Sequence, residues 1–294
     1  MIELLRTGML ATVQDRGRVG YGHLGVPRSG AADQTSYRLA NRLVGNPESA
    51  ACLEFTLGGG AIRFHRACGV AVTGAPAPLR LGGRPIATNQ WARAAAGDVL
   101  ELGVPEYGLR TYVAVSGGIT VPVVLGSRST DTLSGLGPPR LHAGQRLTVG
   151  REYGTPPAGP DVVVAPVPGS SEVTLGYRRG PRDDWFTADA LARFESAAWQ
   201  VTTQSDRVGA RLSGPLLPAE GGDQILSEGM VLGAIEIPAS GQPIVFLADH
   251  PATGGYPVIG VVEPEDVAVL AQTRPGSTVR FARKRTPVQK RMTA

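Results

Sequence analysis

The sequence is poor in aromatic residues and cysteine, and it contains no long apolar run. Aromatic residues make up 5% of the 294 residues, so the core must be built from Val, Leu, Ile and Ala. The run of about 18 apolar residues that a membrane-spanning helix needs does not occur. Cys52 and Cys68 lack C-x-x-C spacing, which favours free thiols in a reducing compartment over a disulfide framework. The first ten residues carry Glu3 and Arg6, unlike a signal peptide, and we therefore expect a cytoplasmic protein.

Several motifs that carry chemistry are also missing. There is no G-x-S-x-G nucleophile motif and no Walker lysine, because both lysines, Lys284 and Lys290, lie near the C-terminus. The histidines show no metal-like spacing; they are His23, His65, His142 and His250. We therefore expect no metal site and no cofactor bound by this chain, and ATP hydrolysis or hydride transfer by this chain alone is not expected.

The net charge of +4 comes from one end of the chain. Residues 279–294 hold six of the 29 basic residues and no acidic residue, while the whole chain has 25 acidic residues. The rest is therefore close to neutral, and the basic end is interpreted as a solvated terminus. No basic stripe with interleaved aromatic residues occurs elsewhere, so nucleic-acid binding is not expected.

Glycine and proline are abundant, with 40 and 24 residues, and they separate many short β-branched segments. This pattern predicts a mainly β fold with strands spaced by roughly 8–12 residues, typical of barrels or sandwiches. The predicted strands are 69–74, 98–103, 111–118, 146–150, 161–167, 242–249 and 277–283. Helical periodicity is convincing over 33–44, over 187–198, where Thr187 is a capping residue, and over 263–272, where Pro264 fits the first helical position.

A proline-rich segment divides the chain into two parts. Residues 150–168 read "GREYGTPPAGPDVVVAPVP", a change in composition typical of a domain junction. We therefore predict an N-terminal domain over 1–155, a C-terminal domain over 156–285 and a basic tail over 286–294.

The first segment with candidate chemistry is "VQDRGRVGYGHLGVPRSGAAD", Val13 to Asp33. Its glycines permit close approach of backbone to a ligand, and the helix that follows offers free N–H groups to an anion. Arg16 and Arg18 are suited to bidentate recognition of a carboxylate or phosphate. The structural alternative is that Asp15 and Arg16 pair and brace a turn.

Two further segments lie in the second half of the chain. In "QSDRVGARLSG", Ser205 and Asp206 offer an acceptor and a base and Arg207 a fixed positive charge, while the alternative is a capped turn. In "ILSEGMVLGAIEIP", Ser227 and Glu228 interrupt two apolar strands. That carboxylate either has a raised pKa suited to acid–base work or is simply solvated.

The fourth segment, "LADHPATGGYP", begins with an apolar strand that ends in Asp249. Residues 253–255 then predict a tight loop rich in N–H groups, which can form a backbone nest for an anion or a developing oxyanion. The structural alternative is an ordinary hairpin.

These segments, in this order, resemble one known family. The matching stretches are "TVQDRGRVGYGHLGVPRSGAADQTSYRLANRLVGN", "YVAVSGGITVPVVLGSRSTDT", "SDRVGARLSG", "SEGMVLGAIEIPASGQPIVFLAD" and "TGGYPVIGVV". They are similar to the family of 5-oxoprolinase C subunits, also called allophanate hydrolase subunit 2 or the KipA-type biotin-dependent carboxyltransferase family. The resemblance runs from about residue 12 to residue 281.

The resemblance implies two cyclophilin-like β-barrel domains with a few short helices. It also implies partners, namely a 5-oxoprolinase B subunit of the KipI type and the corresponding A subunit, which together use ATP to open 5-oxo-L-proline to L-glutamate. One alternative is a carboxyltransferase component of a urea carboxylase or allophanate pathway, with biotin carried by a partner. Another is a non-catalytic KipA-like regulator that binds a KipI-type protein. Neighbouring genes are expected to separate these functions.

The family's motif positions carry over to a defined set of residues in this sequence. The candidate catalytic residues are Asp206, Asp249, Glu228 and Thr253. The candidate substrate-binding residues are Asp15, Arg16, Arg128, Ser205, Arg207, Ser227, Gly254, Gly255 and Tyr256, and Asp33 is a further motif position.

Within that set, the hypothesis is that Arg16 or Arg207 binds the substrate carboxylate, while the backbone of residues 253–255 stabilises the oxyanion. Asp206 or Asp249 is then the base or the group that orients it. His250 and Ala252 depart from the family's usual pattern in this loop, which leaves the substrate preference open.

Overall fold

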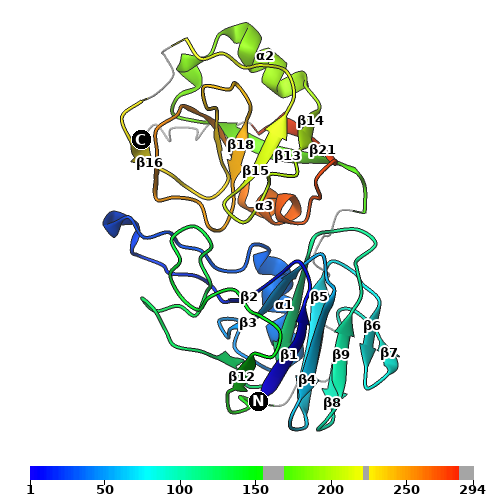
Figure 1. Ribbon diagram of the computed structural model, residues 1–294. Coiled ribbons are helices and arrows are strands. Elements are labelled where there is room, and N and C mark those ends of the chain that lie inside the picture. Colours follow the sequence, from blue (N-terminus) through cyan, green and yellow to red (C-terminus); the bar gives the residue numbers. More distant parts are fainter. Residues whose placement is uncertain (155–168, 221–224, 285–294) are drawn as a thin grey trace, which may run out of the picture.

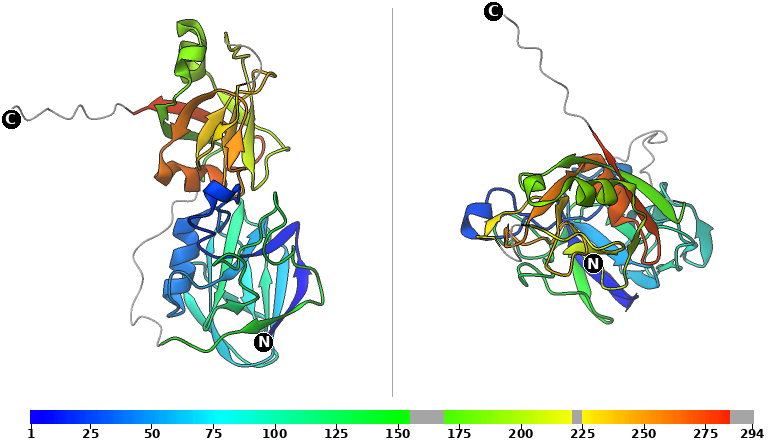
Figure 2. Two further views of the ribbon diagram at one scale, coloured as in Figure 1. Left: turned by 90° about the vertical axis from the view of Figure 1, so that its left-hand side faces the viewer. Right: turned by 90° about the horizontal axis from the view of Figure 1, so that it is seen from above.

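The structure is a computed structural model that describes residues 1–154, 169–220 and 225–284, and it consists of two mainly β domains stacked end to end (Figure 1). Every strand pairing in the described residues joins strands of the same domain. The left view of Figure 2 also shows one domain above the other, with the loop that carries η1 (Gly22–Leu24) at their junction. The predicted mainly β class with a few short helices is confirmed.

The first domain is built from two antiparallel sheets around one core. The seven-stranded sheet has the order β11 (Ile119–Thr120), β12 (Arg146–Val149), β1 (Ile2–Thr7), β4 (Gly60–Phe64), β9 (Val99–Leu102), β6 (Leu79–Leu81) and β7 (Arg84–Ile86). The five-stranded sheet has the order β2 (Leu10–Gln14), β3 (Cys52–Thr56), β10 (Arg110–Val115), β5 (Cys68–Gly74) and β8 (Trp91–Ala94). Leu4 of the first sheet and Phe55 and Val113 of the second belong to one buried cluster.

The helix α1 (Gln34–Leu43) covers the other face of the five-stranded sheet. Tyr37 and Ala40 of the helix pack with Tyr112 and Ala114 of β10, while the alternate residues of that strand face the main core. Since both faces are covered, β10 is buried along its whole length, and the last four residues of its sequence, "RTYVAV", form a continuous apolar run.

The second domain is a closed barrel. Its strand order is β13 (Glu172–Arg179), β20 (Val258–Val262), β17 (Ala234–Glu236), β18 (Ile244–Phe246), β15 (Gly209–Ser213), β14 (Trp199–Val201) and β21 (Thr278–Arg283). β13 and β21 run parallel and complete the ring, which removes the open sheet edges. The helices are η2 (Asp183–Trp185), α2 (Ala188–Ser196) and α3 (Pro264–Ala271). The core holds Trp199 and Phe194, whose ring stacks on Phe281 with centroids 4.5 Å apart.

The three predicted α-helices are confirmed, together with the start signals predicted for α2 and α3. Asp33 caps α1 by accepting a hydrogen bond from the Ser36 amide at 2.9 Å, and Thr187 caps α2 by accepting one from the Ala190 amide at 3.0 Å. Pro264 is the first residue of α3, as predicted.

Strands coincide with six of the seven predicted segments. The seventh, 161–167, lies outside the described residues, as do the predicted domain boundary at 155/156 and the tail 286–294. Cys52 and Cys68 are free, as predicted, and both are buried. Among the described residues, no helix is long and apolar enough to cross a membrane.

Candidate functional site

The two domains are joined by a buried ionic network centred on Arg207. Its Nε and Nη2 donate to the two carboxylate oxygens of Asp249 at 2.9 and 3.0 Å, within the second domain. The same guanidinium reaches the first domain, where Nη2 donates to the Gly30 carbonyl at 2.6 Å and Nη1 to a carboxylate oxygen of Glu54. Arg207 is 2% exposed, so this network holds the domains together in a water-free environment.

Asp249 is bound from the first domain as well. Ser29 Oγ donates to one carboxylate oxygen at 2.7 Å, and the amide and hydroxyl of Thr132 donate to the other at 2.9 and 2.7 Å. Burial alone would raise the pKa of Asp249, but the charge of Arg207 and these hydrogen bonds outweigh it, and the pKa lies below its ordinary value. Of the two roles predicted for this carboxylate, orienting another group fits the geometry better than proton abstraction, because its oxygens are already occupied.

This lowered pKa predicts a definite dependence of stability on pH. A carboxyl group whose pKa is lower in the folded than in the unfolded state stabilises the fold above the unfolded pKa of about 3.9, and that contribution is lost as the pH falls through the folded pKa. The difference in unfolding free energy between wild type and Asp249→Asn should therefore be large near about pH 7 and shrink toward about pH 3. Urea denaturation of both proteins across this range measures it, and a constant difference would contradict the prediction.

A second set of interdomain hydrogen bonds is centred on Gln272, which follows α3. Its Oε1 accepts from the Leu109 and Arg110 amides at 2.9 and 2.7 Å, and its Nε2 donates to Asp33 Oδ2 at 2.9 Å. Burial raises the pKa of Asp33 although Gln272 and Ser36 hydrogen bond to its carboxylate.

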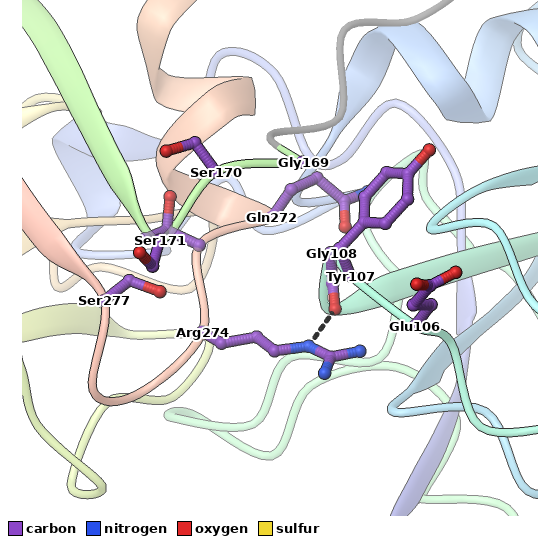
Figure 3. A pocket seen from close by; sticks show the side chains of 10 residues that line it. Glu106, Tyr107, Gly108, Gly169, Ser170, Ser171, Gln272, Arg274 and Ser277 are labelled. Carbon is purple, nitrogen blue, oxygen red and sulfur yellow. Dashed lines mark hydrogen bonds between the residues drawn. The ribbon is translucent and has the colours of Figure 1, made fainter.

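Beside these bonds lies a cavity of about 220 Å³ lined by residues of both domains. Figure 3 shows it, with Arg274 Nε donating to the Gly108 carbonyl at 2.5 Å. Arg274 Nη2 also donates to the Pro105 carbonyl at 2.6 Å, so this guanidinium is committed to linking the domains.

A larger cleft of about 420 Å³, here called the Arg207 cleft, opens between the domains. Its walls are largely apolar, and its polar groups come from both domains. The apolar lining residues include Met9, Leu10, Leu57, Leu109, Leu247 and Leu270; the polar ones include Arg110, Thr132, Arg140, Ser205, Asp206 and Arg207. An apolar cavity with a few converging polar groups at a domain interface is the usual form of a small-molecule site.

The charges of the Arg207 cleft are not equivalent. Arg207 is neutralised by Asp249 and Glu54, and the guanidinium of Arg110 lies 3.7 Å from Glu54. Arg140 is exposed and makes no hydrogen bond or ion pair with any residue that the structure describes. The cation available to a ligand in this cleft is therefore Arg140.

The glycine-rich segment lines a different cleft, here called the Arg18 cleft, with a volume of about 410 Å³. Arg18, Arg28 and neighbouring residues form one side, and His250 and Thr253 of the second domain form the other. The two clefts share no lining residue. Since Arg207 lines one cleft and His250 lines the other, the Arg207–Asp249 pair lies at their boundary.

Some predicted site residues meet in this arrangement. Ser205, Asp206 and Arg207 line the Arg207 cleft, and Asp249 is bonded beneath it. Thr253 lines the Arg18 cleft instead. A single shared site for all of them, as the sequence suggested, is therefore not what the structure shows.

Other predicted residues belong to the scaffold. The carboxylate of Asp15 accepts from the Gly17 amide at 2.8 Å, from the Ser127 and Ser129 hydroxyls at 2.6 Å each and from the Arg128 amide at 2.6 Å. Arg128 Nε donates to the Val121 carbonyl at 3.1 Å.

Arg16 is exposed and lines neither cleft. It does not pair with Asp15 in the described residues, so Asp15 braces the loop through hydroxyl and amide donors instead.

The segments around Glu228 and Thr253 also differ from the expectations. Glu228 is paired with Arg182, whose hydrogen bonds lower the pKa of the carboxyl, so the alternative of a raised pKa is wrong. Residues 253–254 are not a tight loop but a short strand, β19 (Thr253–Gly254), paired with β16 (Glu228–Gly229).

The remaining residues of these segments lie nearby. Gly255 accepts from the Ile225 amide at 2.9 Å, and the Tyr256 amide donates to Glu236 at 3.3 Å. Ser227 is exposed.

Sequence reasoning missed Glu54, which fills the position expected for a bound anion. Its Oε2 accepts from the Ala32 amide at 3.0 Å and from the Tyr112 hydroxyl at 2.8 Å, just before α1. The N–H groups that were expected to favour a ligand are thus taken by Glu54 and by the capping Asp33. The signal was present, since Glu54 is an acidic residue inside an otherwise apolar strand, "CLEFT".

The described residues contain no group of three or more His, Cys, Asp or Glu side chains arranged to hold a metal ion. What the structure defines is a two-domain, mainly β protein with clefts lined by residues of both domains. The match to known proteins is more specific. The chain belongs to the family described as carboxyltransferase domain, subdomain A and B, whose model matches residues 24–283.

Some curated relatives are matched over nearly their whole length, and others over only one part of a longer chain. The 5-oxoprolinase C subunit of Escherichia coli is 37% identical over 288 residues, which cover 96% of this chain and 90% of that protein. The same-named protein of Haemophilus influenzae is 32% identical with the same coverage. Urea amidolyase of Lachancea kluyveri is 34% identical over 95% of this chain but only 17% of its own length.

Solved structures agree. The urea amidolyase of Kluyveromyces lactis superposes with a TM-score of 0.87 at 31% identity, over 95% of this chain and 18% of that one. The urea carboxylase of the same organism gives 0.86 at 31% identity, over 95% of this chain and 27% of that one.

Proposed function

We propose that this chain is the C subunit of a 5-oxoprolinase, which works with separate B and A subunits to open 5-oxo-L-proline to L-glutamate at the expense of ATP. The observation that carries the proposal is the end-to-end match: relatives named as 5-oxoprolinase C subunits align over 96% of this chain and 90% of their own length. The urea amidolyase, by contrast, is matched over only 17% of its length. ATP is bound by a partner in this proposal, and the chain is inactive alone.

The Arg207 cleft has the chemistry that this substrate requires. 5-Oxoproline is a small lactam with a carboxylate, and apolar walls with Arg140 at the surface suit its ring and its charge. The Thr132 hydroxyl donates its proton to Asp249, and its oxygen is left to accept from the ring N–H. Asp206 is the candidate base, since it is exposed and its Oδ1 is held by the Val208 and Gly209 amides at 2.8 and 3.2 Å, which fixes its orientation.

The second candidate function is carboxyl transfer with a biotinylated partner. It is favoured by the family model, which describes a carboxyltransferase domain, and by the superposition on a urea carboxylase. In that case the same cleft accepts a carboxyl group carried into it by biotin on another protein, and urea is the acceptor. Both functions require stabilisation of negative charge that develops on an amide-like group.

The test is reconstitution with candidate partners. The chain is purified alone and after co-expression with candidate A and B subunits, the latter of the KipI type. ATP-dependent turnover is then measured with 5-oxoproline and, with a biotinylated carboxylase, with urea. Glutamate formation by the complex and none by the chain alone is the expected result. Urea-dependent turnover without glutamate formation would favour the second function. Turnover of 5-oxoproline by the isolated chain would contradict the proposal that the chain is inactive without its partners.

Replacing Arg140 with glutamine should raise KM for 5-oxoproline in the complex by about tenfold or more, because a hydrogen-bonded ion pair to a carboxylate contributes about 1.5–3 kcal/mol. A contact made equally in the ground and transition states leaves kcat nearly unchanged. The matched control is Arg93→Gln, an exposed arginine on β8 that lines neither cleft. Equal KM values for the two variants would remove Arg140 from the substrate site.

A further inference from the structure

We propose that the Arg18 cleft is a second ligand site, specific for an organic oxyanion whose carboxylate or phosphate group binds Arg18. The inference does not depend on the proposed function, because it concerns a separate cavity and is tested on the chain without partners. Its basis is a comparison between the two most deeply buried arginines of the residues that the structure describes.

Arg18 and Arg207 are both at most 2% exposed, yet their guanidinium groups are satisfied very differently. Arg207 bonds two carboxylates and a carbonyl. Arg18 makes one side-chain hydrogen bond, from Nη2 to the Ser129 carbonyl at 2.5 Å, and its Nε and Nη1 have no partner among the described residues. A buried cation with two unused donors is costly unless something binds it.

The carboxylates near Arg18 do not supply the missing bonds. Asp15 is saturated by two hydroxyls and two amides, and Asp131 accepts from the Leu133 and Ser134 amides and from the Ser134 hydroxyl at 2.5 Å. Asp249 is occupied by Arg207 and Thr132. These acids attract Arg18 from a distance, while burial lowers its pKa. The two free donors are thus left for a group from outside the chain.

The cleft around Arg18 has the dimensions and lining for an anion with a carbon skeleton. Its volume of about 410 Å³ exceeds that of an inorganic ion, and Val26, Pro27 and Met230 supply apolar wall. Arg28 is exposed at the cleft and adds positive charge on the path to Arg18. Nε and Nη1 are covered in this conformation, so ligand binding requires the Arg18 side chain to move toward the cleft. The cleft has open space at Gly20, where no atom lies within 4 Å of a built Cβ.

The experiment is a thermal-shift titration of the full chain with butanoate, butanamide and inorganic phosphate at constant ionic strength. A ligand that binds the folded state raises the unfolding temperature in a saturable way. We expect butanoate to raise it and uncharged butanamide, which has nearly the same shape, to leave it unchanged. A response to phosphate without one to butanoate would also support the oxyanion site and identify its headgroup as phosphate.

Variants test whether the anion-dependent rise in unfolding temperature depends on Arg18. Arg18→Gln should abolish it, and Arg18→Lys should weaken it, because lysine keeps the charge but loses the planar fork. Since a change at a buried arginine can prevent folding, Arg28→Gln at the exposed rim is the second variant. We expect it to weaken the apparent affinity by about two- to fivefold, whereas Arg93→Gln leaves it unchanged. No anion-dependent shift in the wild type, or equal shifts in the wild type and Arg28→Gln, would overturn the proposal.

Discussion

Replacing Arg207 with alanine is expected to lower the free energy of unfolding by about 3–5 kcal/mol, the usual cost of removing one partner of a buried ion pair. The substitution leaves the carboxylates of Asp249 and Glu54 in a site that water does not reach, each 1% exposed or less. It also removes hydrogen bonds that cross between the domains, including the one to the Gly30 carbonyl. Urea denaturation followed by circular dichroism measures the loss.

The matched control is Arg193→Ala. Arg193 pairs with Asp189 at 2.6 Å on the surface of α2, with their side chains 45% and 78% exposed. Exposed ion pairs of this kind contribute at most about 1 kcal/mol. Similar losses for the two variants would show that the Arg207 network does not behave as a buried one.

The same substitution distinguishes the two clefts. The Arg207 cleft loses a lining side chain and the Arg18 cleft does not. If the variant protein is folded at low temperature, its butanoate response should persist while turnover by the complex falls. Loss of both together would mean that the network controls the relative position of the domains and, through it, both sites.

Local signals account for the parts of the fold that the sequence predicted. Thr187 and Pro264 act through donors or backbone angles within four residues of themselves, and the helical periodicity that begins at Asp33 placed the first helix, so all three helices began where expected. The first strand was missed, and the reason is physical. β1 contains a register shift between Leu4 and Arg6, which interrupts the period-two alternation that identifies a strand.

The strand β13 was missed for a different reason. Gly176 lies in its interior, where glycine weakens a strand pattern. In the structure a Cβ at this position would lie 2.7 Å from the Lys284 side chain and 3.0 Å from the Asp266 carboxylate, which also accepts from the Gly176 amide, so a larger residue would force these side chains to shift. The glycine is therefore explained by a residue 90 positions away, which a local pattern does not reveal.

The candidate site was predictable only in its local parts. Ser205, Asp206 and Arg207 were chosen from one short segment, and they do line a cleft. Their partners were not predictable, because Arg207 and Glu54 are 153 residues apart and Thr132 and Asp249 are 117 residues apart. Such pairs arise from the stacking of two domains, and a single sequence carries no pairing information about that.

In the glycine-rich segment before α1, glycine is required as the sequence suggested, but for a different reason. The glycines were expected to let a ligand approach the backbone. At Gly17 it is instead the backbone of Arg28 and Ser29 that comes close. A Cβ at this position would lie 2.5 Å from the carbonyl oxygens of both Arg28 and Ser29, and φ is +82°. The Arg18 amide donates to the Arg28 carbonyl at 2.6 Å, which closes the loop at this point.

Gly17→Ala should therefore destabilise the protein by about 3 kcal/mol, the sum of left-handed strain and of forced overlap with backbone. Gly25→Ala is the matched control, because Gly25 has a similar φ of +73° but no atom within 4 Å of a built Cβ, and it should cost only about 1 kcal/mol. Urea denaturation of both variants gives the two values. If they cost the same, the close approach at Gly17 is not what requires glycine. If Gly17→Ala alone also abolishes the butanoate response, the backbone contact that closes the loop is what holds Arg18 in position beneath its cleft.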